Sequence, residues 1–102
     1  MKTEFEIRKT KHAGAALLVK GDLTVRCSIE FKERLTELAM ATTRGVPEIS
    51  LKDVTVIDVS AIQLLHAAKQ EFFKGGYKMS VVWPDNEVLN TLITKTGIKQ
   101  AL

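Results

Sequence analysis

Two short stretches at the start of the chain have the hydrophobic pattern of β-strands. Residues 3–8 alternate, with the phenylalanine and the isoleucine on one side and charged residues on the other, which predicts a half-exposed strand. Residues 15–20 are almost continuously apolar, as expected of a strand further inside a sheet. The polar loop that ends at Gly14 predicts an antiparallel hairpin between them. Gly21-Asp22-Leu23-Thr24 is then expected to turn the chain out of the sheet.

A helical period begins at Ser28 and continues to about Thr42. The stripe expected to face the core consists of Phe31, Leu35, Leu38 and Thr42. Ser28 is the expected N-cap, and Gly45 followed by Pro47 is a typical helix stop. This segment is therefore the first predicted helix, and it connects the hairpin to the middle of the chain.

The middle of the chain runs from a strand directly into a second helix. Residues 48–57 predict one strand with a bend or bulge near Lys52-Asp53, and a helix from Ser60 to about Lys74 follows, ended by a pair of glycines. Ser60 with Gln63 three residues later reads as a capping box. The free N–H groups of this helix start would lie at the edge of the sheet, where open α/β folds usually carry their sites.

The last third of the chain predicts one more strand and one more helix. Residues 78–83 form the strand, Pro84 closes it, Asp85 is expected to cap the helix, and Gly97 to end it. The apolar side of that helix is expected to consist of Val88, Leu89, Leu92 and Ile93. The order β-β-α-β-α-β-α implies right-handed crossovers and parallel pairing of the later strands. We therefore expect one α/β domain over residues 1–102, a mixed four-stranded sheet with helices packed on it.

Composition and charge agree with an ordinary folded domain. A length of 102 residues with 45% apolar residues supports one core, and the net charge of +3 is mild. The basic cluster Arg8, Lys9, Lys11 and His12 has no interleaved aromatic residues for base stacking, so nucleic-acid binding is not expected. The N-terminus is unlike a signal peptide, and no apolar run approaches the roughly eighteen residues of a membrane span, so we expect a cytoplasmic protein.

Candidate catalytic and metal-binding residues are few. The single cysteine, Cys27, predicts a structural thiol. His66 lies nearly two turns after Ser60, too far along the helix to act as the base of that serine, and His12 lies on a predicted loop. No metal-ligand spacing and no glycine-rich phosphate loop occur. We therefore expect neither an enzyme nor a bound cofactor.

The chain resembles a known family in three features. They are the order of its elements, the segment Gly21-Asp22-Leu23 and the segment from Val54 to Leu65. The second segment reads Val-Thr-Val-Ile-Asp-Val-Ser-Ala-Ile-Gln-Leu-Leu. With these features, and the closing Thr96-Gly97-Ile98, nearly the whole chain resembles the STAS domain family, named from sulfate transporters and anti-sigma factor antagonists. In its stand-alone bacterial members, an anti-sigma factor that is also a kinase phosphorylates the serine or threonine that starts the second helix. The resemblance implies that Ser60 is the phosphoacceptor.

The resemblance also implies that the unmodified protein binds this partner through a surface around Ser60. That surface would comprise Asp22, Leu23, Thr24, Asp58, Val59, Ala61 and the exposed Gln63. A phosphate would add nearly two negative charges to the interface, while the helix N-terminus tolerates the anion. Phosphorylation would therefore abolish docking and leave the fold intact.

Three positions depart from the usual family motif, and they keep other hypotheses open. Val59 and Ala61 replace the residues that usually flank the phosphoacceptor, and Thr24 stands where many antagonists carry aspartate. Since Ala61 has less backbone freedom than the usual glycine, docking could persist without phosphorylation, with Ser60 only a helix cap. Such a domain could be an accessory subunit on a transporter ATPase or dock on a chemotaxis-linked signalling protein. A further alternative is a small enzyme or nucleotide-binding domain that uses the same helix N-terminus for a phosphate.

Overall fold

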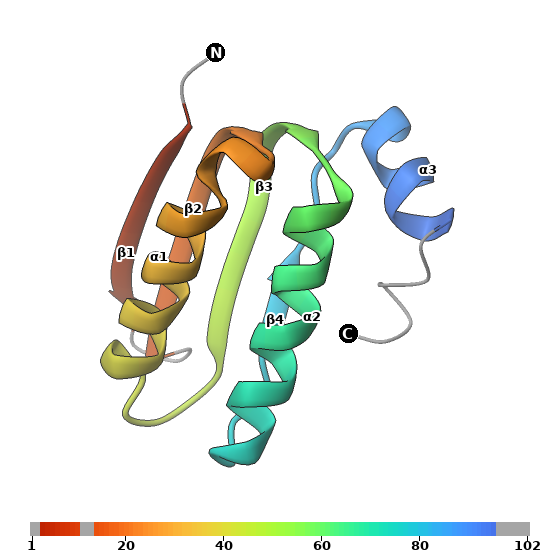
Figure 1. The fold of residues 1–102 in the computed structure, drawn as a ribbon. Helices are drawn as coiled ribbons and strands as arrows, with labels where there is room; N and C mark the ends of the chain where they lie inside the picture. Colours follow the sequence, from red (N-terminus) through yellow and green to blue (C-terminus); the bar gives the residue numbers. More distant parts are fainter. Residues whose placement is uncertain (1–2, 11–13, 96–102) are drawn as a thin grey trace.

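The structure, a computed structural model, describes residues 3–10 and 14–95, without the side chains of Thr10, Val88 and Leu92. Its sheet has the strand order β1-β2-β3-β4 (Figure 1). The strands are β1 (Glu4–Thr10), β2 (Gly14–Leu23), β3 (Pro47–Ile57) and β4 (Ser80–Val82). The β1–β2 pair is antiparallel, and the β2–β3 and β3–β4 pairs are parallel. The predicted mixed four-stranded sheet and its first hairpin are confirmed.

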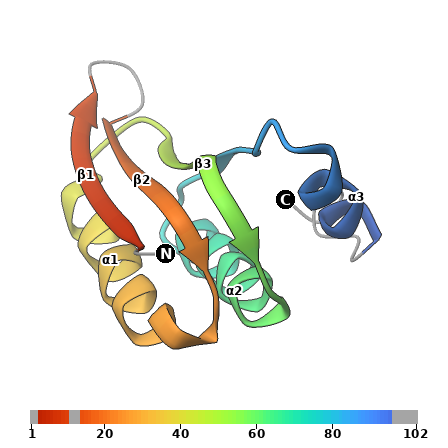
Figure 2. The ribbon, with the colours of Figure 1, turned by 90° about the horizontal axis from the view of Figure 1, so that it is seen from above.

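Two long helices cover one face of this sheet, α1 (Ser28–Ala41) and α2 (Val59–Lys74) (Figure 2). A single 3-10 turn, η1 (Val25–Cys27), leads from β2 into α1. The third helix, α3 (Glu87–Lys95), lies beyond the β3 side of the sheet, away from α1 (Figures 1 and 2). The order of helices and strands is the predicted one, and the fold class is α/β.

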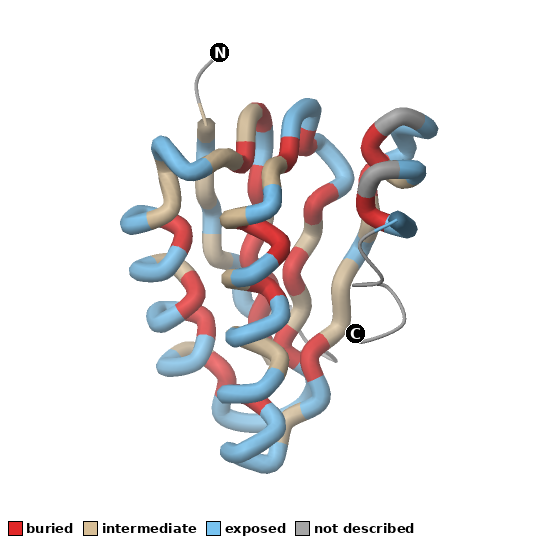
Figure 3. The backbone as a smooth tube through the Cα atoms, turned by 45° about the vertical axis from the view of Figure 1, so that its right-hand side comes forward, coloured by how far each residue is buried: buried red, intermediate tan, exposed pale blue. Residues whose placement is uncertain are grey.

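The buried residues of the hydrophobic core come mainly from the sheet and from α1 and α2, and Leu89 and Ile93 of α3 join them (Figure 3). The whole predicted stripe of α1 is buried, and so are Ile62, Leu65 and Phe72 of α2. Phe5 of β1 stacks on Phe31 of α1, with ring centroids 6.0 Å apart. The one polar member of the α1 stripe, Thr42, donates its hydroxyl to the Leu38 carbonyl over 2.7 Å, so its burial leaves no hydrogen bond unmade.

β3 is one long strand that is irregular close to the predicted place. Leu18 pairs with Ser50 and Lys20 with Asp53, so β3 has one more residue than β2 in this interval. A second shift follows between Gly21 and Asp22 of β2. Extra residues of this kind bend a strand and increase its twist. They bring the last residues of β2 and β3 level with each other at one end of the sheet.

Two predicted boundaries in the sheet are wrong. The expected turn at residues 21–24 is not there, because Gly21, Asp22 and Leu23 continue β2 and pair with β3. Gly21 has a positive φ of 93°, which glycine adopts without strain at the irregular part of the ladder. The last strand is shorter than the predicted residues 78–83, since only Ser80–Val82 pair with β3.

The three predicted helix caps are also displaced. α1 begins at Ser28 with Cys27 in the N-cap position, because η1 winds directly into it. α3 is preceded by Asn86, whose side-chain oxygen accepts the N–H of Leu89 over 3.1 Å in place of the expected Asp85. The predicted end of this helix at Gly97 lies outside the described residues. The third displaced cap, that of α2, belongs to the candidate site.

Candidate functional site

The candidate site lies at the end of the sheet where β2 and β3 finish side by side, at the top of Figure 1. Leu23 is paired with Ile57 there, after which β2 continues into η1 and β3 into α2. The N–H of Asp58 donates to the carbonyl of Leu23 over 3.3 Å. Two loops far apart in the sequence are thereby joined immediately beyond the sheet.

Asp58 binds both loops through its carboxylate. Its Oδ1 accepts the N–H of Ala61 over 3.2 Å, which caps α2, and its Oδ2 accepts the N–H of Val25 over 2.8 Å. The predicted capping box of Ser60 and Gln63 is wrong. Asp58 has the extended backbone of an N-cap, with φ −122° and ψ 177°, whereas Ser60 is already the second residue of the helix.

Ser60, the predicted phosphoacceptor, is half-buried in the first turn of α2. Because Asp58 caps the helix, α2 does not depend on the hydroxyl of Ser60. Serine in the first turn of a helix is also close to free backbone N–H groups, which favour a nearby anion. The hydroxyl of Ser60 can therefore be modified without removing the cap of α2.

Three exposed apolar side chains lie at the end of the fold where β2 and β3 finish. Val25 of η1, Ile29 of α1 and Val59 of α2 are 60%, 77% and 59% exposed, and we call these three residues the apolar patch. Single exposed apolar side chains are ordinary, but a group of them on adjoining segments is typical of a protein-binding surface. Sequence reasoning identified Val59 and missed the other two, although Ile29 is an apolar position off the buried stripe of α1.

The other residues predicted for the binding surface divide into two groups. Leu23 and Ala61 are buried, with exposed fractions of 0% and 2%, so they support the surface from beneath. Asp22 and Thr24 are half-buried, and Gln63 is exposed one turn further along α2. The structure thus brings the predicted residues of the two loops to one end of the sheet, and it leaves the polar ones accessible around the apolar patch.

The remaining candidate residues have ordinary surroundings. Cys27 is half-buried, and its Sγ donates to a backbone carbonyl over 3.2 Å. His66 is exposed on α2, with a ring nitrogen 3.2 Å from the amide nitrogen of Gln70. His12 lies outside the described residues. Within residues 3–10 and 14–95, no three His, Cys, Asp or Glu side chains are grouped so that they could hold a metal ion.

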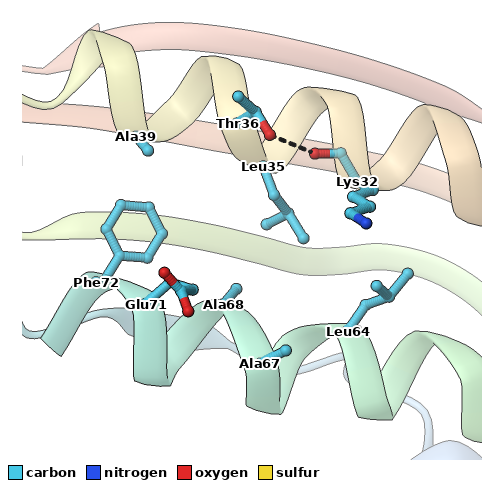
Figure 4. A pocket seen from close by; sticks show the side chains of 9 residues that line it. All are labelled: Lys32, Leu35, Thr36, Ala39, Leu64, Ala67, Ala68, Glu71 and Phe72. Carbon is cyan, nitrogen blue, oxygen red and sulfur yellow. Dashed lines mark hydrogen bonds between the residues drawn. The ribbon is translucent and has the colours of Figure 1, made fainter. Parts of the chain in front are cut away.

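A groove separates α1 from α2 on the helical face, and it has a volume of about 360 Å³ (Figure 4). Its lining is mostly aliphatic and aromatic, namely Leu35, Ala39, Leu64, Ala67, Ala68 and Phe72, with Lys32, Thr36 and Glu71 as polar members. Lys32 and Glu71 lie toward opposite ends of the groove (Figure 4). This lining does not bring an acid and a base together, so the candidate site remains the end of the sheet.

Comparison with known families identifies the fold. A sequence model of the STAS domain matches residues 4–102. The chain belongs to the STAS domain family. No curated protein matches it. Among the described residues of this STAS domain, no helix is both long and apolar enough to cross a membrane.

Three solved structures with a similar fold are named as proposed or known anti-sigma factor antagonists. A proposed antagonist from Thermotoga maritima has a TM-score of 0.74 and 16% identity, covering 94% of this chain and 80% of that one. The STAS domain of an antagonist from Rhodobacter sphaeroides has a TM-score of 0.63 and 17% identity, covering 78% and 85%. The antagonist SpoIIAA in its unphosphorylated form has a TM-score of 0.62 and 11% identity, covering 91% and 97%. At these identities the likeness establishes the STAS fold alone.

Proposed function

We propose that this STAS domain is a regulatory protein-binding module of the anti-sigma factor antagonist type. It docks on an anti-sigma factor with serine kinase activity and is released when that kinase phosphorylates Ser60. The observation that carries the proposal is the position of Ser60, half-buried in the first turn of α2 beside the apolar patch, while Asp58 caps the helix. The solved neighbours that are named as proposed or known anti-sigma factor antagonists support the same role.

The apolar patch supplies the main attraction in this proposal. Val25, Ile29 and Val59 each expose more than half of their surface, so a partner that covers them removes apolar area from water. Covering a side chain of this size contributes about 1 kcal/mol or more to binding. A few such residues usually carry most of the energy of an interface. The half-buried Asp22 and Thr24 and the exposed Gln63 would lie at its polar border.

A phosphate on Ser60 would oppose docking through charge. It adds about −1.5 to −2 charges at neutral pH, next to the carboxylate of Asp58 and beside the apolar patch. Burying that charge against a partner without a matching cation costs more than the apolar contacts return. The first turn of α2 accommodates the anion within the domain itself. The phosphorylated domain would stay folded and lose its partner.

A second candidate is an accessory subunit that docks on a transporter ATPase without phosphorylation. Ala61 favours this candidate, because its methyl group is buried at the start of α2, where the usual family motif has a more adaptable glycine. The docking surface is the same in both candidates. Modification of Ser60 separates them.

Phosphorylation is tested by incubating the full chain with extract from native cells and ATP. Intact mass and peptide mapping over residues 53–69 are then measured for the wild type, Ser60→Ala and Ser28→Ala. Ser28 is a matched control, since it is also half-buried in the first turn of a helix. One phosphate on the wild type and on Ser28→Ala, with none on Ser60→Ala, supports the proposal. A wild type that stays unmodified under conditions in which other proteins are phosphorylated contradicts it.

Docking is tested by recovering bound proteins on the wild type, Ser60→Glu, Val59→Glu and the control Thr91→Glu. Thr91 is exposed on α3, an element that carries no residue of the apolar patch. An anti-sigma factor kinase that binds the wild type and Thr91→Glu and is lost from the other two supports the proposal. A transporter ATPase that binds Ser60→Glu as well as the wild type favours the second candidate. If Val59→Glu recovers as much of the bound partner as the wild type does, docking does not use this surface.

A further inference from the structure

One carboxylate holds together the two halves of the apolar patch. Val59 directly follows Asp58 at the start of α2, whereas Val25 belongs to η1, on the other loop. The bond of 2.8 Å from the N–H of Val25 to Asp58 Oδ2 links the two loops through a side chain. The relative position of Val25 and Val59 therefore depends on Asp58.

η1 has few other contacts that fix its first residue. None of its residues is fully buried, and Cys27, at its far end, is the one that packs partly against the core, so Val25 gains little from apolar packing. Within the turn, the N–H of Cys27 donates to the carbonyl of Thr24 over 3.1 Å, a bond that closes the turn without attaching it to α2. A hydrogen bond to a charged carboxylate is about twice as strong as one between neutral groups. The Asp58–Val25 bond is therefore the main attachment of η1 to α2.

We propose that Asp58 is a positioning residue that transmits the phosphorylation state of Ser60 to η1. The inference rests on the proposed function, in which Ser60 carries the phosphate. Ser60 lies two residues after Asp58 in the same turn, so a phosphate there shares the N–H groups at the start of α2 with the Asp58 carboxylate. Two anions at one helix start repel each other, and the phosphate has the larger charge. The carboxylate turns away, the Val25 bond is lost, and the two halves of the patch separate.

The substitution Asp58→Asn separates the two roles of this residue. Asn caps helices about as well as Asp, so Asp58→Asn keeps an oxygen for the N–H of Ala61. Its second terminal group is NH₂, which donates and cannot accept the N–H of Val25. Asp58→Ser is a second variant of the same kind, because serine is also a good cap and its shorter side chain has one oxygen only.

The test is amide hydrogen exchange, measured by NMR on the full chain with no partner present. The samples are the wild type, Asp58→Asn, Asp58→Ser, the chain with phosphoserine incorporated at position 60, and Gln63→Glu. Gln63→Glu adds a negative charge to the exposed side of α2 one turn further on, so it controls for charge alone. We expect the Val25 amide to exchange about tenfold faster in the phosphoserine chain and in both Asp58 variants, since one hydrogen bond to a charged group is lost. The Ala61 amide should stay protected in the Asp58 variants, and Gln63→Glu should match the wild type at both amides.

The results separate this inference from the proposed function. Unchanged exchange at Val25 in the phosphoserine chain overturns the role of Asp58, even if the same phosphate abolishes partner binding. Faster exchange at Val25 in the phosphoserine chain, with partner binding unaffected, supports the role of Asp58 and contradicts the proposed function. Faster exchange that Gln63→Glu reproduces overturns the inference, because any added charge on α2 would then have the same effect.

Discussion

The core and the candidate site of this STAS domain are held together by different interactions. Beneath α1 and α2, large apolar side chains such as Phe31, Leu65 and Ile49 are fully buried and pack against one another. At the end of the sheet, the apolar residues Val25, Ile29 and Val59 are exposed, and hydrogen bonds to Asp58 join the loops. Most of the stability of the domain comes from the core, and the surface that can be rearranged lies at the end of the sheet.

This difference explains how such a domain can be regulated without unfolding. Removing a large buried side chain costs several kcal/mol, a considerable part of the stability of a small domain. A hydrogen bond at the site contributes about 1 to 3 kcal/mol at most, because water competes for exposed groups. A phosphate on Ser60 can therefore rearrange the site while the core remains intact.

The largest effect on stability is expected from Leu65→Ala. Leu65 is 0% exposed in the core, so truncation removes buried apolar surface and leaves a cavity, at a cost of about 3 kcal/mol. Leu64→Ala is the matched control, since the neighbouring leucine is only half-buried and should cost about 1 kcal/mol. Urea denaturation gives both values. Equal losses would show that α2 is not anchored through Leu65, and the contrast between core and surface would fail.

A loss of similar size is expected from Gly14→Ala, at the end of the sheet opposite the site. Gly14 has φ 82°, and an added methyl group would overlap the carbonyl oxygen of Arg44. Gly76 has a similar φ of 87° with nothing within 4 Å of an added methyl group, so Gly76→Ala isolates the strain of the backbone. We expect losses of about 3 kcal/mol for Gly14→Ala and about 1 kcal/mol for Gly76→Ala in urea denaturation. Similar losses would mean that the loop of Arg44 moves aside easily.

The sequence predicted the framework of the fold because periodicity reports the core. Each residue of the stripe from Phe31 to Thr42 is buried, and the run from strand to helix through Asp58 is present. The β2–β3 ladder was harder to predict. Gly21 has the composition of a turn, yet pairing with the irregular part of β3 keeps it in the strand. Local propensity was overruled there by a strand far away in the sequence.

The site was predicted in part, and the missing parts depend on contacts between the two loops. Ser60 and Asp58 are both good N-cap residues, so the sequence cannot decide between them. In the structure Asp58 is the cap, and its carboxylate also accepts the N–H of Val25. No local sequence pattern reports that second bond. Val25 and Ile29 were missed for a similar reason, because each is an unremarkable apolar residue in the sequence and only the fold leaves it exposed near the end of the sheet.

A smaller effect on stability is expected from substitution of Asp58. Asp58→Ala loses the cap of α2 and the bond to Val25, at a cost of about 2 kcal/mol. Asp58→Asn keeps the cap, so it should lose about 1 kcal/mol or less. Thermal denaturation of both variants gives the comparison. If the two lose the same stability, the cap contributes nothing measurable, and the whole loss comes from the Val25 bond.

The smallest effect on stability, and the sharpest test of the comparison, is expected from Ile29→Gln and Met40→Gln. Both residues are exposed on α1, 77% and 79%, but Ile29 is in the first turn beside the site and Met40 is near the other end of the helix. Each variant should change the free energy of unfolding by no more than about 0.5 kcal/mol, because neither side chain is buried. Partner binding, by contrast, should differ between the two variants.

Ile29→Gln is expected to weaken partner binding by about tenfold, since the partner no longer covers an apolar side chain, and Met40→Gln should leave binding unchanged. Titration of the partner against both variants measures the difference. If both variants weaken binding equally, the partner contacts the whole length of α1, and the docking surface extends down the helical face. If neither variant changes binding, Ile29 lies outside the interface, and only the Val59 side of the apolar patch remains as a docking surface.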